Sequence, residues 1–236
     1  MTLIELLGSP IAQDPAYHLF ADDRTLLGIP NFWNVVSNIP FMVVGALGFQ
    51  VAWENRQEPL RIVWLAFFAG IFLTALGSGY YHFAPDNESL AWDRLTMTIG
   101  LMSFVAIVIG EYLSVDWGKR LLVPLLIAGA ASVYYWIHTE SLGAGDLRPY
   151  AAVQFLPMLV VPIIVIARRS RSDLGPYIVC MIGIYVLAKI PEHYDAEVLA
   201  MGNLLSGHSI KHILSALAPA CLLIGLRKRQ HGGLQG

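Results

Sequence analysis

Charged residues are scarce in this sequence: they make up 14% of the 236 residues, against 56% hydrophobic residues. Because soluble domains carry about 25% charged residues, this composition excludes an ordinary soluble domain and indicates a membrane protein. The formal net charge of -2 gives no reason to expect a nucleic-acid partner. Cysteine is also scarce. Cys180 and Cys221 both fall inside apolar runs, so a disulfide framework is not expected.

Long apolar runs replace the missing charge. Runs of a length that crosses a bilayer as a helix follow one another at 32–52, 62–82, 94–113, 121–137, 150–167, 174–191 and 207–226. This pattern predicts an all-α integral membrane protein with a seven-transmembrane helix bundle over 32–226. We expect residues 1–31 to form an extramembrane cap, because they lack the basic and apolar regions of a cleaved signal peptide. Residues 227–236 are expected to be a short basic tail.

The connections between the runs differ in charge on alternate turns. One set of connections holds ten of the fifteen lysines and arginines, and the other holds five. Basic loops face the cytoplasm, so the pattern predicts a cytoplasmic C-terminus and, with seven spans, an N-terminus outside. The basic set comprises Arg56, Arg61, Lys119, Arg120, Arg168, Arg169, Arg171, Arg227, Lys228 and Arg229.

Polar side chains gather at the outer ends of three runs. Ser78 and His82 end the second run, Asp93 begins the third, and His208 and His212 begin the seventh. Both pairs are spaced i, i+4, which places their members on one face of a helix. Two histidines of one helix and one of a neighbour make a three-imidazole cup, the ligand count of a catalytic zinc site.

Plainer interpretations of each residue remain open. A lone histidine near the interface usually bonds to a carbonyl or to water. Ser78 lies in "GSG", where small residues let helices approach each other. Asp93 also fits as a cap of the third span. The remaining histidines lie in expected loops or tails and are not assigned to the site: His18, His138, His193 and His231.

Three motifs carry a family resemblance over about residues 31 to 226. "NFWNVVSN", "SGYYH" followed by Asp93, and "GHSIKH" resemble, in order and spacing, the signatures of the alkaline ceramidase family. That family belongs to the superfamily of the adiponectin-receptor-like proteins. The resemblance implies an intramembrane hydrolase that cleaves the amide of ceramide to a sphingoid base and a fatty acid. It also implies that His82, His208 and His212 hold Zn²⁺, with Ser78 and Asp93 close by.

The chemistry of amide hydrolysis suits these residue types. Asp93 is the expected general base, which accepts a proton from water and returns it to the departing amine. Ser78 is expected to donate a hydrogen bond to the oxygen that gains charge, or to orient the attacking water. An apolar cavity among the helices would take the acyl chain. The expected partner is therefore a ceramide-like membrane lipid, and no obligatory protein partner is indicated.

The sequence departs from the family pattern at two places. The eukaryotic signature continues Asp-Glu-Leu-Pro, whereas Arg94 follows Asp93 here. Family members also carry an N-terminal calcium site with a glutamate before Phe-Trp-Asn, and that position is Asn31 here. Asp22 and Asp23 supply carboxylates nearby, so a Ca²⁺ site with Asn31 and a solvated loop both remain open.

Two further points allow more than one interpretation. One is the role of the charged residues at the outer end of the sixth run, and the other is the class of protein. Lys189, Glu192 and Asp195 suit an ion pair, a headgroup contact or snorkelling to the interface. A receptor or signalling protein of the same superfamily would keep a structural zinc site. A transporter would spread polar groups through the membrane depth, whereas here they cluster at one end. The sequence does not separate ceramide from another acyl lipid.

Overall fold

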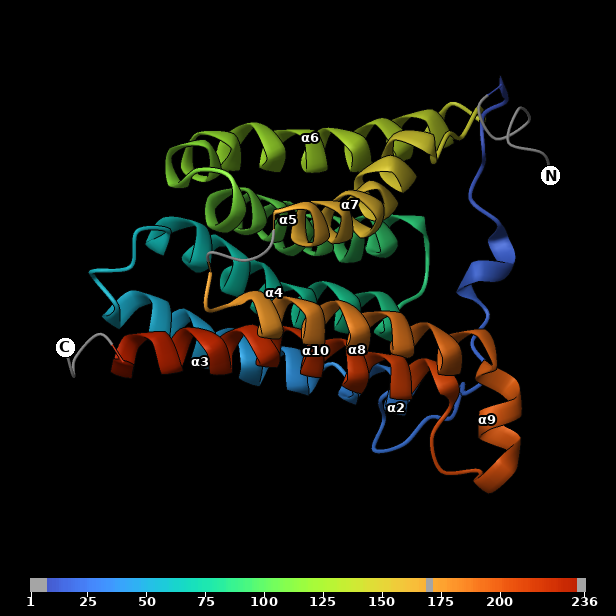
Figure 1. The fold of residues 1–236 in the computed structure, drawn as a ribbon. Coiled ribbons are helices and arrows are strands. Elements are labelled where there is room, and N and C mark those ends of the chain that lie inside the picture. Colours follow the sequence, from blue (N-terminus) through green and yellow to red (C-terminus); the bar gives the residue numbers. More distant parts are fainter. Residues whose placement is uncertain (1–7, 169–171, 233–236) are drawn as a thin grey trace.

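The computed structural model describes residues 8–168 and 172–232. Arg169 and Arg171, which contribute to the predicted cytoplasmic charge, lie outside these residues. Figure 1 shows the described chain as a layered bundle of helices lying side by side. In chain order the elements are η1 (Pro15–His18), α2 (Phe32–Val36), α3 (Ile39–Glu54), α4 (Arg61–Phe83), α5 (Asn87–Tyr112), α6 (Val115–Ser141), α7 (Arg148–Ala167), α8 (Gly175–His193), α9 (Asp195–Gly202) and α10 (Gly207–Gly232).

Seven of these segments are long and apolar enough to cross a membrane. They are Phe32–Glu54, which joins α2 and α3, and the helices α4, α5, α6, α7, α8 and α10. The prediction of an all-α, seven-helix membrane bundle is therefore confirmed. The side of the membrane on which each end lies stays a prediction.

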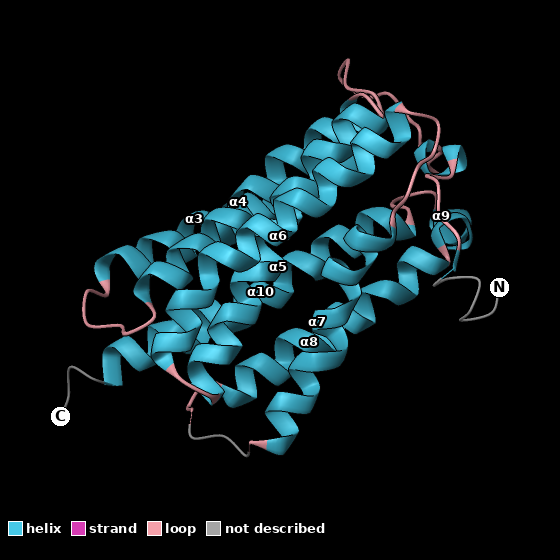
Figure 2. Cartoon of the chain, turned by 90° about the horizontal axis from the view of Figure 1, so that it is seen from above, coloured by secondary structure: helices cyan, strands magenta, loops and turns pink. Residues whose placement is uncertain are grey.

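A cavity inside the bundle is lined by residues of α3, α4, α5, α7, α8 and α10. Neighbours in sequence pack together from α3 to α7, and α10 packs between α8 and α3. Seen from above, the described chain consists of helices joined by loops (Figure 2). The main core lies between α4, α5 and α10, where Trp64, Phe68, Phe104 and Leu222 are buried. Because the bilayer satisfies no backbone polar group, helices that bond internally are the form these apolar segments adopt.

Helix α5 begins earlier than its apolar run indicates. It starts at Asn87 and is capped by Asp86, whose carboxylate accepts the N–H of Ser89 at 2.7 Å. The Ser89 hydroxyl in turn accepts the N–H of Asp86 at 3.1 Å, which completes a capping box. Asp93 is consequently in the second turn of α5. Its placement at the beginning of the span, and the interpretation of Asp93 as a cap, were both wrong.

The N-terminal segment covers one end of the bundle, the end at which α9 also lies (Figure 1). The carbonyl of Ile11 accepts the N–H of Leu147, at 2.8 Å. The ring of His18 bonds to Tyr81 Oη at 3.1 Å and to Asn87 Oδ1 at 3.0 Å. These contacts tie the N-terminal segment to the neighbouring ends of α4, α5 and α7.

Candidate metal centre

Three imidazoles meet beneath the N-terminal segment. One ligand atom from each of His82, His208 and His212 lies within 4.8 Å of the others. The Nε2 atoms of His82 and His208 are 3.3 Å apart, and the three ring centroids are 4.7 to 4.9 Å from one another. The ring of Phe20 covers the cup, with its centroid 4.6 Å from that of His82. The predicted cup of one histidine from α4 and two from α10 is present.

A hydrogen-bond chain fixes the tautomer of His212. Ser37 Oγ lies 2.8 Å from His212 Nδ1 and 3.2 Å from the carbonyl oxygen of Asn34. The hydroxyl proton goes to the carbonyl, since a carbonyl accepts only, so Ser37 accepts the Nδ1–H of His212. Nε2 of His212 then keeps its lone pair, which is the state that binds a metal. The described imidazoles therefore fit Zn²⁺, which prefers nitrogen donors of this kind.

Two glycines allow the helices to bring the histidines together. A Cβ on Gly77 would lie 2.5 Å from Thr96 Oγ1 and 2.8 Å from the Trp92 carbonyl. At this point α4 and α5 can lie so close together because Gly77 has no side chain. A Cβ on Gly207 would collide with the carbonyl of Pro191 at the end of α8. The carboxylate of Asp195 accepts the N–H of His208 at 2.6 Å and so anchors the first turn of α10. The close approach at Gly77 agrees with the interpretation of "GSG" as small residues that let helices approach, whereas sequence reasoning missed the roles of Gly207 and of the Asp195 carboxylate.

Ser78 and Asp93 face the same cavity as the three histidines. This cavity has a volume of about 430 Å³. Both side chains line it and both are buried, at 4% and 8% exposure. Asp93 Oδ1 has no hydrogen-bond partner among the described residues. The deeper wall is apolar and includes Phe67, Ile71, Phe104, Met181 and Ile182.

Charged residues of α8 and α10 border the cup. Lys189 and Lys211 both form ion pairs with Glu192, at 2.8 and 3.1 Å. The Lys211 ammonium also lies 3.1 Å from His208 Nε2. The ion-pair interpretation of Lys189 and Glu192 is thus confirmed, whereas Lys211 was not singled out from the sequence because its partner lies 19 residues away.

The three residues considered for calcium do not converge. Arg24 binds both carboxylate oxygens of Asp22, at 2.8 and 2.6 Å, and this bonding lowers the pKa of Asp22 below its ordinary value. Asp23 is exposed. The side-chain nitrogen of Asn31 donates to the carbonyl of His82 at 2.8 Å. A guanidinium already holds the buried carboxylate, so the described residues do not support a Ca²⁺ site.

A protein-family model described as ceramidase matches residues 28–231. The chain belongs to the ceramidase family. The match covers most of the chain and includes Ser78, His82, Asp93, His208 and His212. No curated protein matches the sequence. Membership in this family implies an amide hydrolase that acts on ceramide, in a multi-pass membrane protein.

Proposed function

We propose that the protein is a zinc-dependent hydrolase that cleaves the amide of a ceramide-like lipid within the membrane. His82, His208 and His212 would hold the metal. The observation that carries this proposal is the convergence of three imidazoles with a buried carboxylate on one cavity that continues into an apolar chamber. When bound, zinc supplies a Lewis acid that lowers the pKa of water to roughly 7.

The chain orients its own ligands. The Ser37 hydroxyl holds His212 in the tautomer whose Nε2 is free, and the Asp195 carboxylate holds the backbone at His208. Such supporting contacts typically account for about 10- to 100-fold of metal affinity. Phe20 covers the rings of His82 and His208, and so shields the cup from bulk water.

Asp93 is the proposed general base. Its Oδ1 has no partner among the described residues, and capping of α5 is performed by Asp86. The carboxylate is therefore available to take a proton from the attacking water. As the carbon–nitrogen bond breaks, Asp93 returns this proton to the amine, so that a sphingoid amine and a fatty acid leave.

Ser78 is proposed to act on the carbonyl oxygen of the amide. It lies one turn before His82 on α4 and lines the same cavity. Its hydroxyl can donate to the oxygen that gains negative charge in the tetrahedral intermediate. The apolar wall formed by Phe67, Phe104 and Met181 would hold the acyl chain.

The Asp93→Asn variant tests the proposal. Asparagine keeps the shape of the side chain but accepts no proton, so turnover of ceramide should fall by about 10² to 10⁴. Zinc content and melting temperature should stay unchanged, and Asp116→Asn, an exposed position in the first turn of α6, serves as the control. Unchanged turnover would remove Asp93 from the mechanism. A parallel loss of zinc would make Asp93 a support of the metal site instead.

The active site is proposed to face the non-cytoplasmic side, in accordance with the basic loops. Glu88 lies at the end of the bundle that the N-terminal segment covers, here called the capped end, and Lys119 lies near the opposite end. Both residues are exposed. In a background without Cys180 and Cys221, an impermeant thiol reagent should label Glu88→Cys in intact cells and Lys119→Cys only after lysis. The reverse pattern would place the site on the cytoplasmic side.

A further inference from the structure

The polar end of the cavity carries more cations than carboxylates. Arg94, Lys189 and Lys211 line it together with Asp93 and Glu192. At neutral pH the ordinary charges of these five side chains sum to +1. Glu192 receives both lysines, at 2.8 and 3.1 Å, and one carboxylate does not neutralise two ammonium groups.

Arg94 has no acidic partner in the part of the chain that the structure describes. Its side chain is 6% exposed, its Nη2 donates to the neutral Gln13 Oε1 at 2.7 Å, and its Nη1 has no hydrogen-bond partner there. Asp93 precedes it directly, but adjacent positions on a helix do not face each other, and the two side chains form no ion pair.

Aromatic rings hold the Arg94 guanidinium without neutralising it. It lies 4.1 Å from the centroid of Trp136, 4.8 Å from Tyr150 and 5.7 Å from Tyr17. These cation–π contacts orient the group, but arginine stays protonated in proteins and a buried charge without a counter-ion is unfavourable. An ionisable side chain inside a membrane protein generally marks a functional site.

We propose that this polar end binds an anionic oxygen group on the headgroup of the substrate, such as a phosphate, a sulfonate or a carboxylate. This assignment rests on the proposed function and specifies its substrate class: an N-acyl lipid with an anionic headgroup, preferred over neutral ceramide. Nη1 of Arg94 has no partner among the described residues and can donate to one oxygen of the group, and the lysines beside Glu192 add donors on the α8 and α10 side.

A matched pair of lipids tests the preference directly. Ceramide and ceramide 1-phosphate with the same chains are supplied in mixed micelles of a neutral detergent, and released fatty acid is measured. Wild-type kcat/KM should be higher for the phosphate lipid by about tenfold to a hundredfold, the usual worth of hydrogen bonds to a charged group. Equal values, or a preference for ceramide, overturn the proposal.

Variants separate a binding role from a structural one. Arg94→Gln should remove most of the preference for the phosphate lipid, because kcat/KM should fall further for the phosphate lipid, which loses its anion contact, than for ceramide. Arg94→Lys should restore part of the preference. Arg120→Gln removes an exposed cation from α6 outside the cavity and should preserve the preference, which excludes general attraction to a charged micelle. Equal losses on both lipids in Arg94→Gln overturn the proposal.

Lys189→Gln tests the same subsite without replacing a buried residue. The Lys189 side chain is 42% exposed, so its replacement disturbs little packing. It too should lower the preference. The released fatty acid also carries a carboxylate, so product inhibition is measured in parallel. If Arg94→Gln relieves only inhibition by fatty acid while wild-type enzyme shows no headgroup preference, the headgroup assignment is overturned.

Binding to a non-hydrolysing protein keeps this inference apart from the proposed function. Ceramide 1-phosphate should raise the melting temperature of Asp93→Asn protein more than ceramide does, and Arg94→Gln should cancel the difference in that background. If neither lipid is hydrolysed by the wild type, the proposed reaction fails, while this melting difference still supports the subsite. Hydrolysis of both lipids without any melting difference leaves the reaction intact and overturns the subsite.

Discussion

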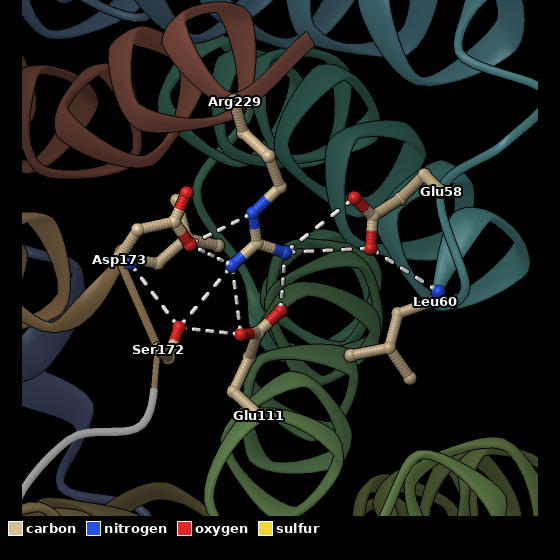
Figure 3. A network of polar contacts seen from close by, with 7 residues as sticks. Glu58, Leu60, Glu111, Ser172, Asp173 and Arg229 are labelled. Atoms are coloured by element: carbon tan, nitrogen blue, oxygen red, sulfur yellow. Dashed lines mark hydrogen bonds and ion pairs between the residues drawn. The ribbon is translucent and has the colours of Figure 1, made fainter. Parts of the chain in front are cut away.

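The two ends of the bundle treat buried charge in opposite ways. At the end away from the N-terminal segment, Arg229 of α10 is surrounded by acceptors (Figure 3). Its two terminal nitrogens bind Glu111 at 2.8 and 2.9 Å, and Asp173 and Glu58 complete the set at 2.5 and 3.4 Å. Here the carboxylates outnumber the cation, and every nitrogen of the guanidinium has a partner.

This network joins four parts of the fold. Glu58 precedes α4, Glu111 lies in the last turn of α5, Asp173 precedes α8, and Arg229 lies in the last turns of α10. At the capped end, three imidazoles face one another, and Asp93 Oδ1 and Arg94 Nη1 lack partners among the described residues. A satisfied network holds helix ends together, whereas groups that converge without satisfying each other suit a ligand.

The largest effect is expected from the cup itself. His208→Ala removes one of three proposed zinc ligands, so bound zinc and hydrolysis should fall to the level of chelator-treated protein, while the helices stay folded. Elemental analysis and fatty-acid release measure both. His138→Ala, an exposed histidine of α6, should change neither. Full zinc content in His208→Ala would show that His208 is not a zinc ligand and would contradict the assignment of this end of the bundle to ligand binding.

The opposite end should respond in stability and not in chemistry. Arg229→Met leaves Glu111 and Glu58 as buried carboxylates without their cation, which typically costs about 3 to 5 kcal/mol. We expect the lower end of that range, since Asp173 is 61% exposed and is screened by solvent. Melting temperature should fall, while zinc content and turnover per folded molecule stay constant. Lost turnover without a stability change would contradict a structural role; Arg227→Met, at an exposed position, is the control.

The features that the sequence predicts are those that depend on composition and short spacing. Seven apolar runs correspond to seven spans because hydropathy alone decides which segments enter a bilayer. His208 and His212 share a helix face at i, i+4 of α10, and His82 lies near the end of α4 on the same side of the bundle. The helix period puts His208 and His212 on one face, and the alternating direction of the spans puts His82 at the same level along the bundle.

The features that escaped prediction depend on polar turns or on long-range contacts. Asp93 was misplaced because the capping box at Asp86 and Ser89 precedes the apolar run and extends the helix into a polar stretch. The pairing of Lys211 with Glu192 depends on how α10 lies against α8. The bond from Arg24 to the carbonyl of Asn203 spans 179 residues, and no local pattern encodes it.

The smallest expected effect is on the melting temperature and concerns the ion pair between Arg24 and Asp22 at the capped end. Its replacement tests whether a satisfied ion pair is structural at this end as well. Arg24 binds the Asp22 carboxylate and also donates to the carbonyls of Asn203 and Leu204, at 2.7 and 3.0 Å. The pair lowers the pKa of Asp22 in the folded state, so its stabilising contribution is present at neutral pH and is lost as pH falls through that lowered pKa.

Asp22→Asn should therefore melt below the wild type at pH 7, by less than Arg229→Met does, because the Arg24 side chain is 37% exposed. The difference in melting temperature should be constant from about pH 5 to 8 and shrink below about pH 4, near the ordinary aspartate pKa. Asp23→Asn is the matched control and should melt as the wild type does.

Since the guanidinium occupies both oxygens of Asp22, added Ca²⁺ or a chelator should leave the wild-type melting temperature unchanged. A rise with Ca²⁺ that Asp22→Asn abolishes would show that the carboxylate exchanges its guanidinium for a metal, and the pair would then belong with the ligand-binding groups of this end.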